Sequence, residues 1–406
     1  MHIGLVTGEY PPDQGGVGDF TTQLGRALAD LGHEVHVIAA KSQTPNPKLQ
    51  NPTSGVVVHR VVEGWGWGCW RQVLEVAQEL RVEVLNLQYQ AAAYRMHPAI
   101  NFVPPRHDRP PVVATFHDLN VPYLFPKAGP LRWHVVRMLA RRADGVIVTN
   151  REDYVRLERE IPSARLSLIP IGSNIPPAPP PGYDRDAERA RWGVGPGDLL
   201  LGYFGFLNES KGGEELMQAL ALLVERGVSA HLLMVGGRLG SSDPTNRAYA
   251  ERVEDLIADL GLDERVHWTG YTGPEQVSAG LLATDACVLP YRDGVSFRRG
   301  TLHACLAHGR AVVTTRPAVP LPEVRDGENM LLAEPRDPQA LADVVMRLTI
   351  VDPMARPGVE AKGLSEPESA TGPALRTRLG VGASALAAEF TWERIARKTA
   401  ALFRRL

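Results

Sequence analysis

The chain has 406 residues, of which 44% are hydrophobic, 22% charged and 6% aromatic, a composition typical of globular rather than disordered proteins. Lys and Arg number 44 against 46 Asp and Glu, and this net charge of −2 argues against nucleic acid as a main partner, because phosphate contacts need clustered surplus cations. Three cysteines, a strand-like start and no apolar run of about 20 residues exclude a disulfide framework, a signal peptide and a transmembrane helix, so we expect a cytoplasmic protein of two or three domains.

The first 172 residues alternate short apolar runs with longer helical patterns. The runs are apolar almost throughout, as expected of parallel strands that are buried on both faces. Between the first two, Val17–Leu31 has apolar residues at helical spacing and stops before Gly32, a usual stop signal. This order predicts a doubly wound α/β domain over residues 1–172. The expected strands are Ile3–Thr7, Val35–Ala39, Val56–Val61, Val84–Leu87, Val112–Phe116, Val146–Thr149 and Leu166–Pro170.

Residues 173–197 change character, because six prolines fall within them, and they predict a semi-rigid linker. Asp184-Arg185-Asp186 in this segment is interpreted as solvated charge. A second α/β series over residues 198–390 predicts a second Rossmann-like domain, with a surface loop at 352–373. Its expected strands are Leu199–Phe204, Ala230–Val235, Val266–Thr269, Ala286–Leu289 and Ala311–Thr315, and its expected helices are Gly213–Arg226, Tyr249–Leu260 and Thr301–His308.

Two Rossmann-like doubly wound domains that face a central cleft are the α/β architecture that we expect. Open α/β sheets bind ligands outside the carboxyl ends of their strands, so the loops at those ends are the places to search for a site. A closing helix is expected from about Thr391 to Leu406.

The first such loop is glycine-rich and follows the first expected strand. Gly15 and Gly16 precede a helix there, so backbone amides can approach an anion closely. The loop is longer than a G-x-G-x-x-G turn, which argues against a dinucleotide fingerprint. The alternative is a helix start with flexible glycines and no ligand.

A His-Asp pair, His117 and Asp118, ends another buried strand. A neutral imidazole there could donate a hydrogen bond to a sugar hydroxyl or to a leaving oxygen, or it could be a satisfied structural histidine. No H-x-x-H or C-x-x-C spacing predicts a metal site. The other histidines of the first domain are interpreted as structural or surface residues: His2, His33, His36, His59, His97, His107 and His134.

Two loops of the second domain place cations at helix starts. Lys211 comes directly before a Gly-Gly pair, and Arg298 and Arg299 come directly before Gly300. An ammonium or guanidinium group beside free amides can bind phosphate, and each charge-assisted hydrogen bond contributes about 1.5–3 kcal/mol. The alternatives are a solvated lysine and a salt-bridged surface loop.

Together these motifs resemble the glycosyltransferases of family 4, which have the two-domain GT-B fold and usually retain the anomeric configuration. The resemblance covers almost the full length. It is carried by Gly15-Gly16-Val17 with residues 24–35, His117-Asp118, residues 143–148 and 169–172, Lys211-Gly212, Gly270-Tyr271, residues 283–290 and Phe390-Thr391-Trp392.

The resemblance implies transfer of a sugar from a nucleoside-diphosphate sugar to a hydroxyl acceptor, with no cofactor and no metal. It implies catalytic roles for His117, Lys211 and Arg299, and it implies that helix 391–406 packs back on the first domain. The implied donor-binding residues are Gly15, Gly16, Asn208, Lys211, Tyr271, Ser296, Phe297, Arg298, Arg299, Gly300 and Thr301. The implied acceptor-side residues are Glu9, Gln88, Tyr89, Asp118 and Asn120.

The chain departs from the family pattern at three positions. Phe206 stands where most members have an arginine, and Ser296 and Ala304 stand where most have two glutamates. The Ser-Phe-Arg-Arg-Gly loop resembles that of a divergent subgroup. These departures leave open an alternative function, a catalytically weak sugar-nucleotide-binding subunit that partners another glycosyltransferase.

Contact with the inner face of a membrane is a second open alternative. Residues 131–142 form a basic amphipathic pattern of the kind that lies on anionic lipid, and an ordinary packed helix has the same pattern.

Overall fold

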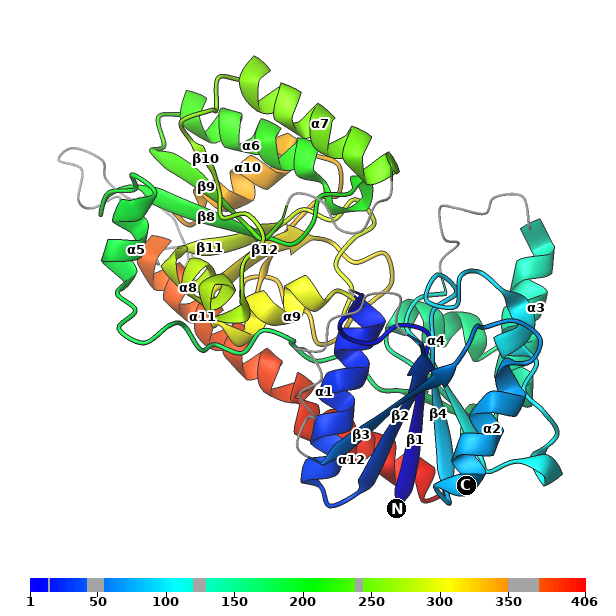
Figure 1. Ribbon diagram of the computed structural model, residues 1–406. Coiled ribbons are helices and arrows are strands. Elements are labelled where there is room, and N and C mark those ends of the chain that lie inside the picture. Colours follow the sequence, from blue (N-terminus) through cyan, green and yellow to red (C-terminus); the bar gives the residue numbers. More distant parts are fainter. Residues whose placement is uncertain (14, 42–54, 120–128, 238–243, 350–371) are drawn as a thin grey trace. The chain divides into compact units, whose positions relative to one another are not determined.

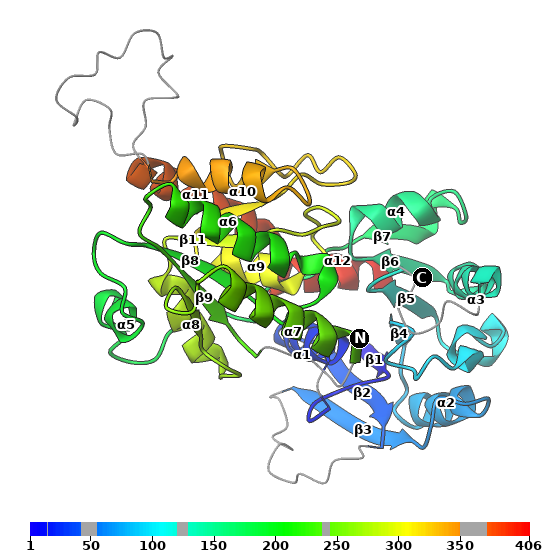
Figure 2. The ribbon, with the colours of Figure 1, turned by 90° about the horizontal axis from the view of Figure 1, so that it is seen from above.

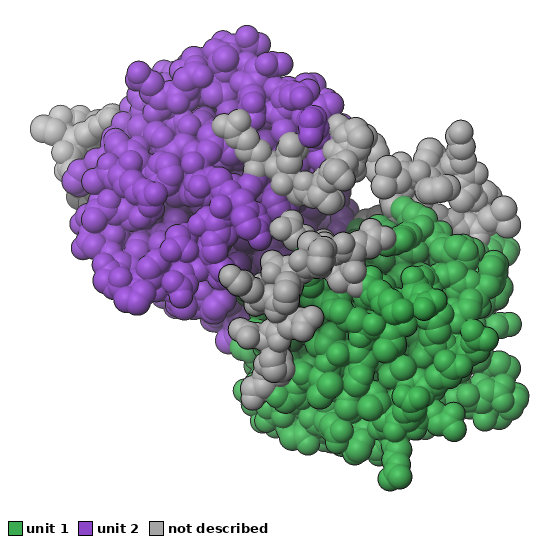
Figure 3. Space-filling view, viewed as in Figure 1, with its two compact units in different colours: residues 1–174, 390–406 green, residues 175–389 purple. Residues whose placement is uncertain are grey.

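The computed structural model describes residues 1–13, 15–41, 55–119, 129–237, 244–349 and 372–406. These residues form two compact units, and Figure 3 shows them in different colours. Unit 1 comprises residues 1–174 and 390–406, and unit 2 comprises residues 175–389. Asn120 and most of the expected surface loop, residues 352–371, lie outside the described residues.

Unit 1 is built on a seven-stranded, all-parallel sheet with the order β3-β2-β1-β4-β5-β6-β7. Successive strands join the sheet on either side of β1, as in a doubly wound fold. The strands are β1 His2–Thr7, β2 Glu34–Ala40, β3 Val56–Val62, β4 Val84–Tyr89, β5 Val112–Phe116, β6 Gly145–Val148 and β7 Leu166–Leu168.

Helices cover both faces of this sheet (Figures 1 and 2). One core contains apolar side chains of α1 and α12, and the other contains side chains of α2, α3 and α4. In the second core, Tyr89 at the end of β4 stacks on Tyr94, which also contacts Trp65. The helices are α1 Gly16–Asp30, α2 Cys69–Glu79, α3 Gly129–Arg142, α4 Arg151–Leu157 and α12 Trp392–Phe403, with 3₁₀ turns at Pro98–Asn101, Arg106–Asp108 and Ser163–Arg165.

Unit 2 has a six-stranded parallel sheet with the order β10-β9-β8-β11-β12-β13. Figure 1 shows α6, α7 and α10 on one face of this sheet and α8, α9 and α11 on the other. The strands are β8 Leu199–Phe204, β9 Ala230–Val235, β10 Val266–Trp268, β11 Ala286–Leu289, β12 Ala311–Thr315 and β13 Leu331–Ala333. The helices are α5 Arg185–Arg191, α6 Gly213–Glu225, α7 Pro244–Asp259, α8 Pro274–Ala283, α9 Gly300–Ala307, α10 Pro338–Met346 and α11 Gly372–Ala387, with 3₁₀ turns at Glu209–Lys211 and Ala388–Phe390.

The structure confirms the expected strands, five of them with identical bounds. Several elements that the sequence analysis did not predict are also present: β13, α2, α4, α5, α8, α10 and α11. The last of these begins at Gly372 and includes Pro373, so the expected surface loop ends in a helix. Short helices such as α5 lack the repeated apolar spacing on which prediction from periodicity depends.

One helix lies inside the proline-rich segment 173–197. Asp184 caps this helix, α5, by accepting a hydrogen bond from the Ala187 amide at 2.7 Å. Arg185 forms an ion pair with Asp285 at 2.9 Å. The interpretation as solvated charge holds for Asp184 and Asp186, which are exposed, and is wrong for Arg185, which pairs with Asp285.

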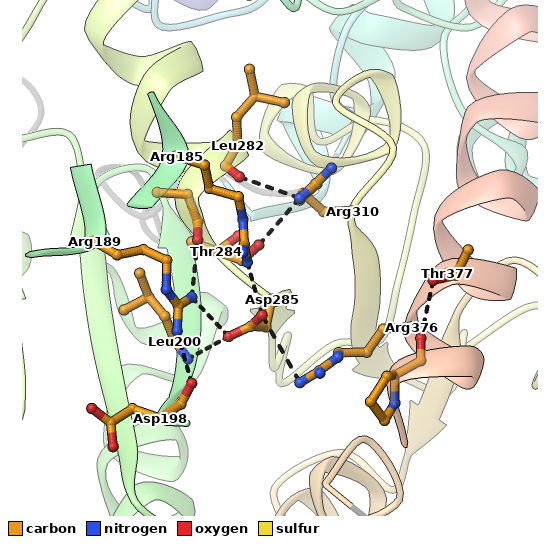
Figure 4. A network of polar contacts seen from close by, with 12 residues as sticks. Arg185, Arg189, Asp198, Leu200, Leu282, Thr284, Asp285, Arg310, Arg376 and Thr377 are labelled. Carbon is orange, nitrogen blue, oxygen red and sulfur yellow. Dashed lines mark hydrogen bonds and ion pairs between the residues drawn. The ribbon is translucent and has the colours of Figure 1, made fainter. Parts of the chain in front are cut away.

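The partner of Arg185 is the centre of a polar network in unit 2 (Figure 4). Asp285 directly precedes β11, and one of its oxygens accepts hydrogen bonds from Arg189 Nη1 at 2.9 Å and from the Leu200 amide at 2.8 Å. Arg189 is buried and also donates to the Asp198 carbonyl at 2.8 Å. The network ties α5 to the amino ends of β8 and β11.

Unit 1 repeats this arrangement at the start of β6. Asp144 directly precedes that strand, accepts a hydrogen bond from the Val112 amide at 2.8 Å and pairs with Arg106 and Arg109. The arginines, chiefly through hydrogen bonds, together with the Val112 amide outweigh the effect of burial and lower the pKa of Asp144. A carboxylate therefore links neighbouring strand starts in both units.

The basic amphipathic pattern corresponds to α3, and its apolar face is buried in unit 1. Val136, Leu139 and Ala140 belong to the core, and Trp133 packs against it. This face is therefore already covered by protein. Among the helices of the described residues, none is long and apolar enough to cross a membrane.

Candidate functional site

A cationic cluster lies at the carboxyl ends of β8 and β11 in unit 2. Gly205 follows β8, and a Cβ atom at this position would lie 3.2 Å from Lys211 Nζ and 2.7 Å from Thr301 Cγ2. Gly212 has φ 69°, and a Cβ atom there would lie 2.0 Å from the Pro290 carbonyl oxygen. The two glycines thus allow three loops of unit 2 to converge, which brings Lys211 to the start of α9.

The arginines of the second loop share one carboxylate. Arg298 pairs with Asp293 at 2.5 Å, and Arg299 pairs with the other oxygen of the same carboxylate. The Arg299 guanidinium also stacks on Tyr291 at 4.2 Å from the ring centroid, and Tyr291 shares a hydrogen bond of 2.8 Å with Thr301. Stacking on an aromatic face fixes the planar fork of an arginine, which suits it to bind phosphate oxygens.

Lys211 is held close to this arginine. Its ammonium donates a hydrogen bond of 2.9 Å to the Phe206 carbonyl. Burial, with a smaller contribution from Arg299, lowers the pKa of Lys211 to about 8. The cluster therefore carries more positive than negative charge, and an anion bound there would relieve the repulsion between the two cations.

The amino end of α9 completes the cluster. No side chain caps this helix, whose N-cap residue is Arg299, so the first amides remain available to an anion. Ser296 and Phe297 are buried before it, and the Ser296 hydroxyl has no hydrogen-bond partner within the described part of the chain. His303, one turn into α9, donates a hydrogen bond of 2.8 Å from Nε2 to the Phe297 carbonyl.

Two of the expected donor residues lie at other places in unit 2. Asn208 precedes the 3₁₀ turn that ends at Lys211, and its side chain accepts a hydrogen bond of 2.8 Å from Ser210. The Tyr271 side chain is 75% exposed. The structure thus brings Lys211, Arg298, Arg299, Gly300 and Thr301 together. Asn208 lies next to this group, before the turn that ends at Lys211, whereas Tyr271 is exposed to solvent.

In unit 1, the glycine-rich loop is organised by a carboxylate. Glu9 accepts hydrogen bonds from the Val17 amide at 2.9 Å and from the Gly18 amide at 3.3 Å, so it occupies amides at the start of α1. A Cβ atom at Gly15 would lie 2.1 Å from this carboxylate, whereas one at Gly16 would meet nothing within 4 Å. Burial raises the pKa of Glu9 despite these two hydrogen bonds. Gly16 therefore leaves open space beside a helix start whose next amides are already bound.

His117 ends a chain of side-chain hydrogen bonds that runs across β4 and β5. Asn86 donates to the Val113 carbonyl at 3.1 Å, and because a carbonyl only accepts, this bond fixes the orientation of the Asn86 amide. Gln88 donates to the Asn86 oxygen and turns its own oxygen to His117 Nε2 at 3.0 Å. The order of donors therefore places the imidazole proton on Nε2.

This order leaves Nδ1 of His117 as a hydrogen-bond acceptor. Burial lowers the pKa of His117 to about 3, so the ring is neutral near pH 7. The ring edge packs against Phe20 at a centroid distance of 4.6 Å, and Phe20 in turn contacts Trp392 of α12. The expectation that the imidazole donates a hydrogen bond to substrate thus changes to acceptance through Nδ1.

The remaining acceptor-side residues differ in their surroundings. Tyr89 is buried in the core, where its ring contacts Tyr94 and Phe116. Asp118 is partly buried and lies near Asp153. Burial, with a smaller contribution from Asp118, raises the pKa of Asp153 to about 6. The sequence analysis missed Asp153, which accepts hydrogen bonds from the Leu119 amide and from Asn150. Its position two residues into a short helix carried no recognisable signal.

Comparisons with known proteins indicate the class to which this chain belongs. A family model described as Glycosyltransferase Family 4 matches residues 14–175, and one described as Glycosyl transferases group 1 matches residues 198–349. The D-inositol 3-phosphate glycosyltransferase of Nocardia farcinica is 27% identical over 355 residues, which cover 82% of this chain and 76% of that protein. That of Corynebacterium diphtheriae is 25% identical over 414 residues, which cover 96% and 90%.

Solved structures share the fold over the whole chain. Sucrose-phosphate synthase from Thermosynechococcus elongatus matches with a TM-score of 0.73 and 22% identity, covering 100% of this chain and 98% of that one. Anabaena HepE in complex with UDP-glucose matches with a TM-score of 0.73 and 18% identity, covering 100% of both. The fold is therefore GT-B, and the chain is an enzyme of the glycosyltransferase class. More narrowly, its first domain is similar to glycosyltransferases of family 4 and its second to glycosyl transferases of group 1.

Proposed function

We propose that this glycosyltransferase transfers a sugar from a nucleoside-diphosphate sugar to a hydroxyl acceptor, with the diphosphate bound in unit 2. The observation that carries the proposal is the convergence of Lys211, Arg298 and Arg299 on the uncapped start of α9, where Asp293 is the carboxylate that both arginines share. Such a group of cations matches the charge of a diphosphate. It lies at the carboxyl ends of parallel strands, where α/β sheets bind ligands.

The chemistry that these residues supply is electrostatic. When the bond between the anomeric carbon and the diphosphate breaks, negative charge grows on the leaving oxygen, and fixed cations stabilise that charge more than they stabilise the donor. Lys211 and Arg299 are the residues that we assign to this role. Because they supply the positive charge that a divalent ion supplies in other transferases, we propose a reaction that is independent of metal. We propose that it retains the anomeric configuration because the chain resembles family 4, whose members usually do so.

We assign the acceptor side and the orientation of the sugar to unit 1. His117 presents Nδ1 as an acceptor, so we propose that it accepts a hydrogen bond from a sugar hydroxyl while Gln88 holds its tautomer. Gly15 and Gly16 remain proposed donor-binding residues, and a Cβ atom at Gly16 would meet nothing within 4 Å, so this position leaves room for a ligand.

The relatives suggest which compounds to test first. Solved structures of similar fold are described as complexes with UDP and with UDP-glucose, and the similar curated proteins are named D-inositol 3-phosphate glycosyltransferases. Uridine-diphosphate sugars are therefore the first donors, and phosphorylated cyclitols join sugars and lipids among the first acceptors.

The test is release of nucleoside diphosphate by the purified chain from a panel of nucleotide sugars, with and without acceptors and with EDTA present. We expect turnover of one donor, and a loss of about 10²–10³ in kcat/KM for Lys211→Ala and for Arg299→Ala, as for other groups that stabilise a leaving anion. Lys398→Ala is the matched control, because Lys398 is an exposed lysine of α12. If the Lys211 and Arg299 variants turn over the donor as fast as the wild-type chain does, the assignment is contradicted.

A sugar-nucleotide-binding subunit without activity of its own is the second candidate function. The observation that favours it is the neutral character of Ser296 and Ala304, two buried positions beside the cationic cluster. This candidate predicts that a nucleotide sugar raises the melting temperature of the chain and that no acceptor produces turnover. Lys211→Ala would abolish that thermal shift under both functions, whereas turnover by the wild-type chain excludes the second.

A further inference from the structure

Three side chains at the amino end of the unit 1 sheet converge on one point. His2 begins β1 and pairs in register with Glu34, which begins β2, and His36 follows two residues later. Residues two apart on a strand point to the same face, and directly paired residues of neighbouring strands do so too. The backbone alone therefore places all three side chains on one face of the sheet.

The distances between these side chains suit a metal ion. Glu34 offers one oxygen to His36 Nε2 at 3.1 Å and the other to His2 Nε2 at 3.4 Å, and the three ligand atoms lie within 4.8 Å of one another. A tetrahedral zinc ion with bonds of about 2.0–2.2 Å holds its ligands roughly 3.3–3.6 Å apart. The two oxygens of the carboxylate lie close to this spacing from the two rings, and the imidazole nitrogens lie within 4.8 Å of each other, so a bound ion would draw the half-exposed His2 side chain inward.

A fourth residue provides the support that ligating histidines usually have. His36 Nδ1 lies 3.2 Å from His59 Nε2 on β3. A metal on Nε2 of His36 requires the proton to be on Nδ1, which then donates to His59, and such a second partner orients the ring and raises its basicity.

We propose that His2, Glu34 and His36 bind one divalent metal ion of borderline softness, Zn²⁺ above all, with water as the fourth ligand. Two imidazoles and one carboxylate are a ligand set that favours zinc over magnesium or calcium. The site lies at the amino ends of β1 and β2, whereas Glu9 and His117 follow the carboxyl ends of β1 and β5, and Gln88 is near the carboxyl end of β4. It therefore has a structural role, linking the starts of two strands, and it does not depend on the proposed transferase mechanism.

The test is titration of the chelator-treated full chain with zinc chloride at pH 7.5 by calorimetry, together with the absorption spectrum of the cobalt-loaded protein. We expect one equivalent of zinc, a rise in melting temperature, and visible cobalt bands of a four-coordinate site. Glu34→Gln should weaken zinc binding at least tenfold. Its side chain is 55% exposed, so this variant retains the fold even if the variant of buried His36 does not.

Two further variants separate the proposal from adventitious binding. His59→Gln should keep one equivalent of bound zinc but weaken it about 10–100-fold, as loss of a supporting partner does. His107→Gln, which alters an exposed histidine beside Asp108, should bind zinc as the wild type does. The proposal is overturned if the wild-type chain binds less than one equivalent, or if Glu34→Gln and His107→Gln bind zinc equally well; the three side chains are then an ordinary hydrogen-bonded group.

Discussion

Gln88 accepts a hydrogen bond from His117 Nε2 at 3.0 Å, and this contact decides which side of the imidazole remains for a substrate. Gln88 can accept there only because its amide nitrogen donates to Asn86, whose own amide is oriented by the Val113 carbonyl. A backbone carbonyl in the middle of the sheet thus sets the tautomer of a residue at its edge.

We expect Gln88→Leu to destabilise unit 1 and to release the tautomer of His117. The change leaves the His117 Nε2 proton and the Asn86 oxygen without partners, and an unsatisfied buried polar group costs about 1–3 kcal/mol. Urea unfolding measures the loss, and nitrogen chemical shifts of the imidazole report the tautomer. Gln78→Leu, at an exposed position of α2, is the control and should stay within about 0.5 kcal/mol of wild type. If the imidazole nitrogen shifts of the Gln88 variant are unchanged, the hydrogen bonds through Gln88 do not fix the tautomer of His117.

The affinity for a nucleoside diphosphate should fall as the pH rises through about 8. Lys211 must be charged to bind the diphosphate, and its pKa is lowered to about 8, so the charged fraction falls roughly tenfold between pH 7 and pH 9. Calorimetric titration across this range measures the effect. Lys211→Arg keeps its charge at pH 9 and should bind with nearly constant affinity. A wild-type affinity that does not vary with pH would contradict the role of Lys211.

Asp293→Asn should tighten the binding of inorganic pyrophosphate. Asp293 neutralises Arg298 and Arg299, and a bound anion must compete with its carboxylate. Because Asp293 is partly exposed, each of these ion pairs contributes about 1 kcal/mol or less, which corresponds to a gain of roughly two- to fivefold in affinity. Asp343→Asn, which breaks an exposed pair with Arg226, serves as the control and should leave affinity unchanged. Weaker binding by the Asp293 variant would mean that this carboxylate positions the arginines for the anion.

Stability should decrease on the acid side through His303. Its pKa is about 4 in the folded chain because of burial, against about 6.5 when unfolded, so the unfolded state binds the proton first as the pH falls. The contribution of the neutral ring is complete above pH 6.5 and is lost between pH 6.5 and 4, about 2 kcal/mol by pH 5. His303→Asn should flatten this dependence in urea unfolding measured at pH 7.5 and pH 5, whereas His107→Asn should not. A parallel decline in wild type and in the His303 variant would assign the acid sensitivity to other groups.

Arg189→Met should destabilise unit 2 by about 3 kcal/mol. The change removes the ion pair between Arg189 and Asp285, both of which are largely buried, and removal of one member of a buried pair costs about 3–5 kcal/mol. Arg185 still neutralises the carboxylate, which places the expected value at the low end. Arg226→Met, which removes an exposed pair, should cost less than about 1 kcal/mol in the same thermal or urea measurement. Equal effects of the two changes would mean that the network does not hold α5 to the sheet.

The strand pattern was readable from the sequence because parallel strands that are buried on both faces are continuous apolar runs. Val112–Phe116 and Ala311–Thr315 are examples with identical predicted and observed bounds. Short helices that contact other elements through a few residues, such as α5, have no such period. Their position depends on partners that are distant in the chain, as Arg189 depends on Asp285 about a hundred residues later.

The sequence by itself determined the α/β class, the family resemblance and the cations that precede two helix starts of unit 2, because each is carried by local spacing around strand ends and helix starts. Only the tertiary structure decided that Glu9 occupies the amides of α1, that His117 donates to Gln88 through Nε2 and keeps Nδ1 as its acceptor, and that Tyr89 lies in the core. The same holds for His2, Glu34 and His36: His2 lies 32 positions before Glu34, and strand register brings it beside the other two. Hydrogen-bond direction and ligand convergence are properties of neighbours in space, and the spacing of residues along one strand does not contain them.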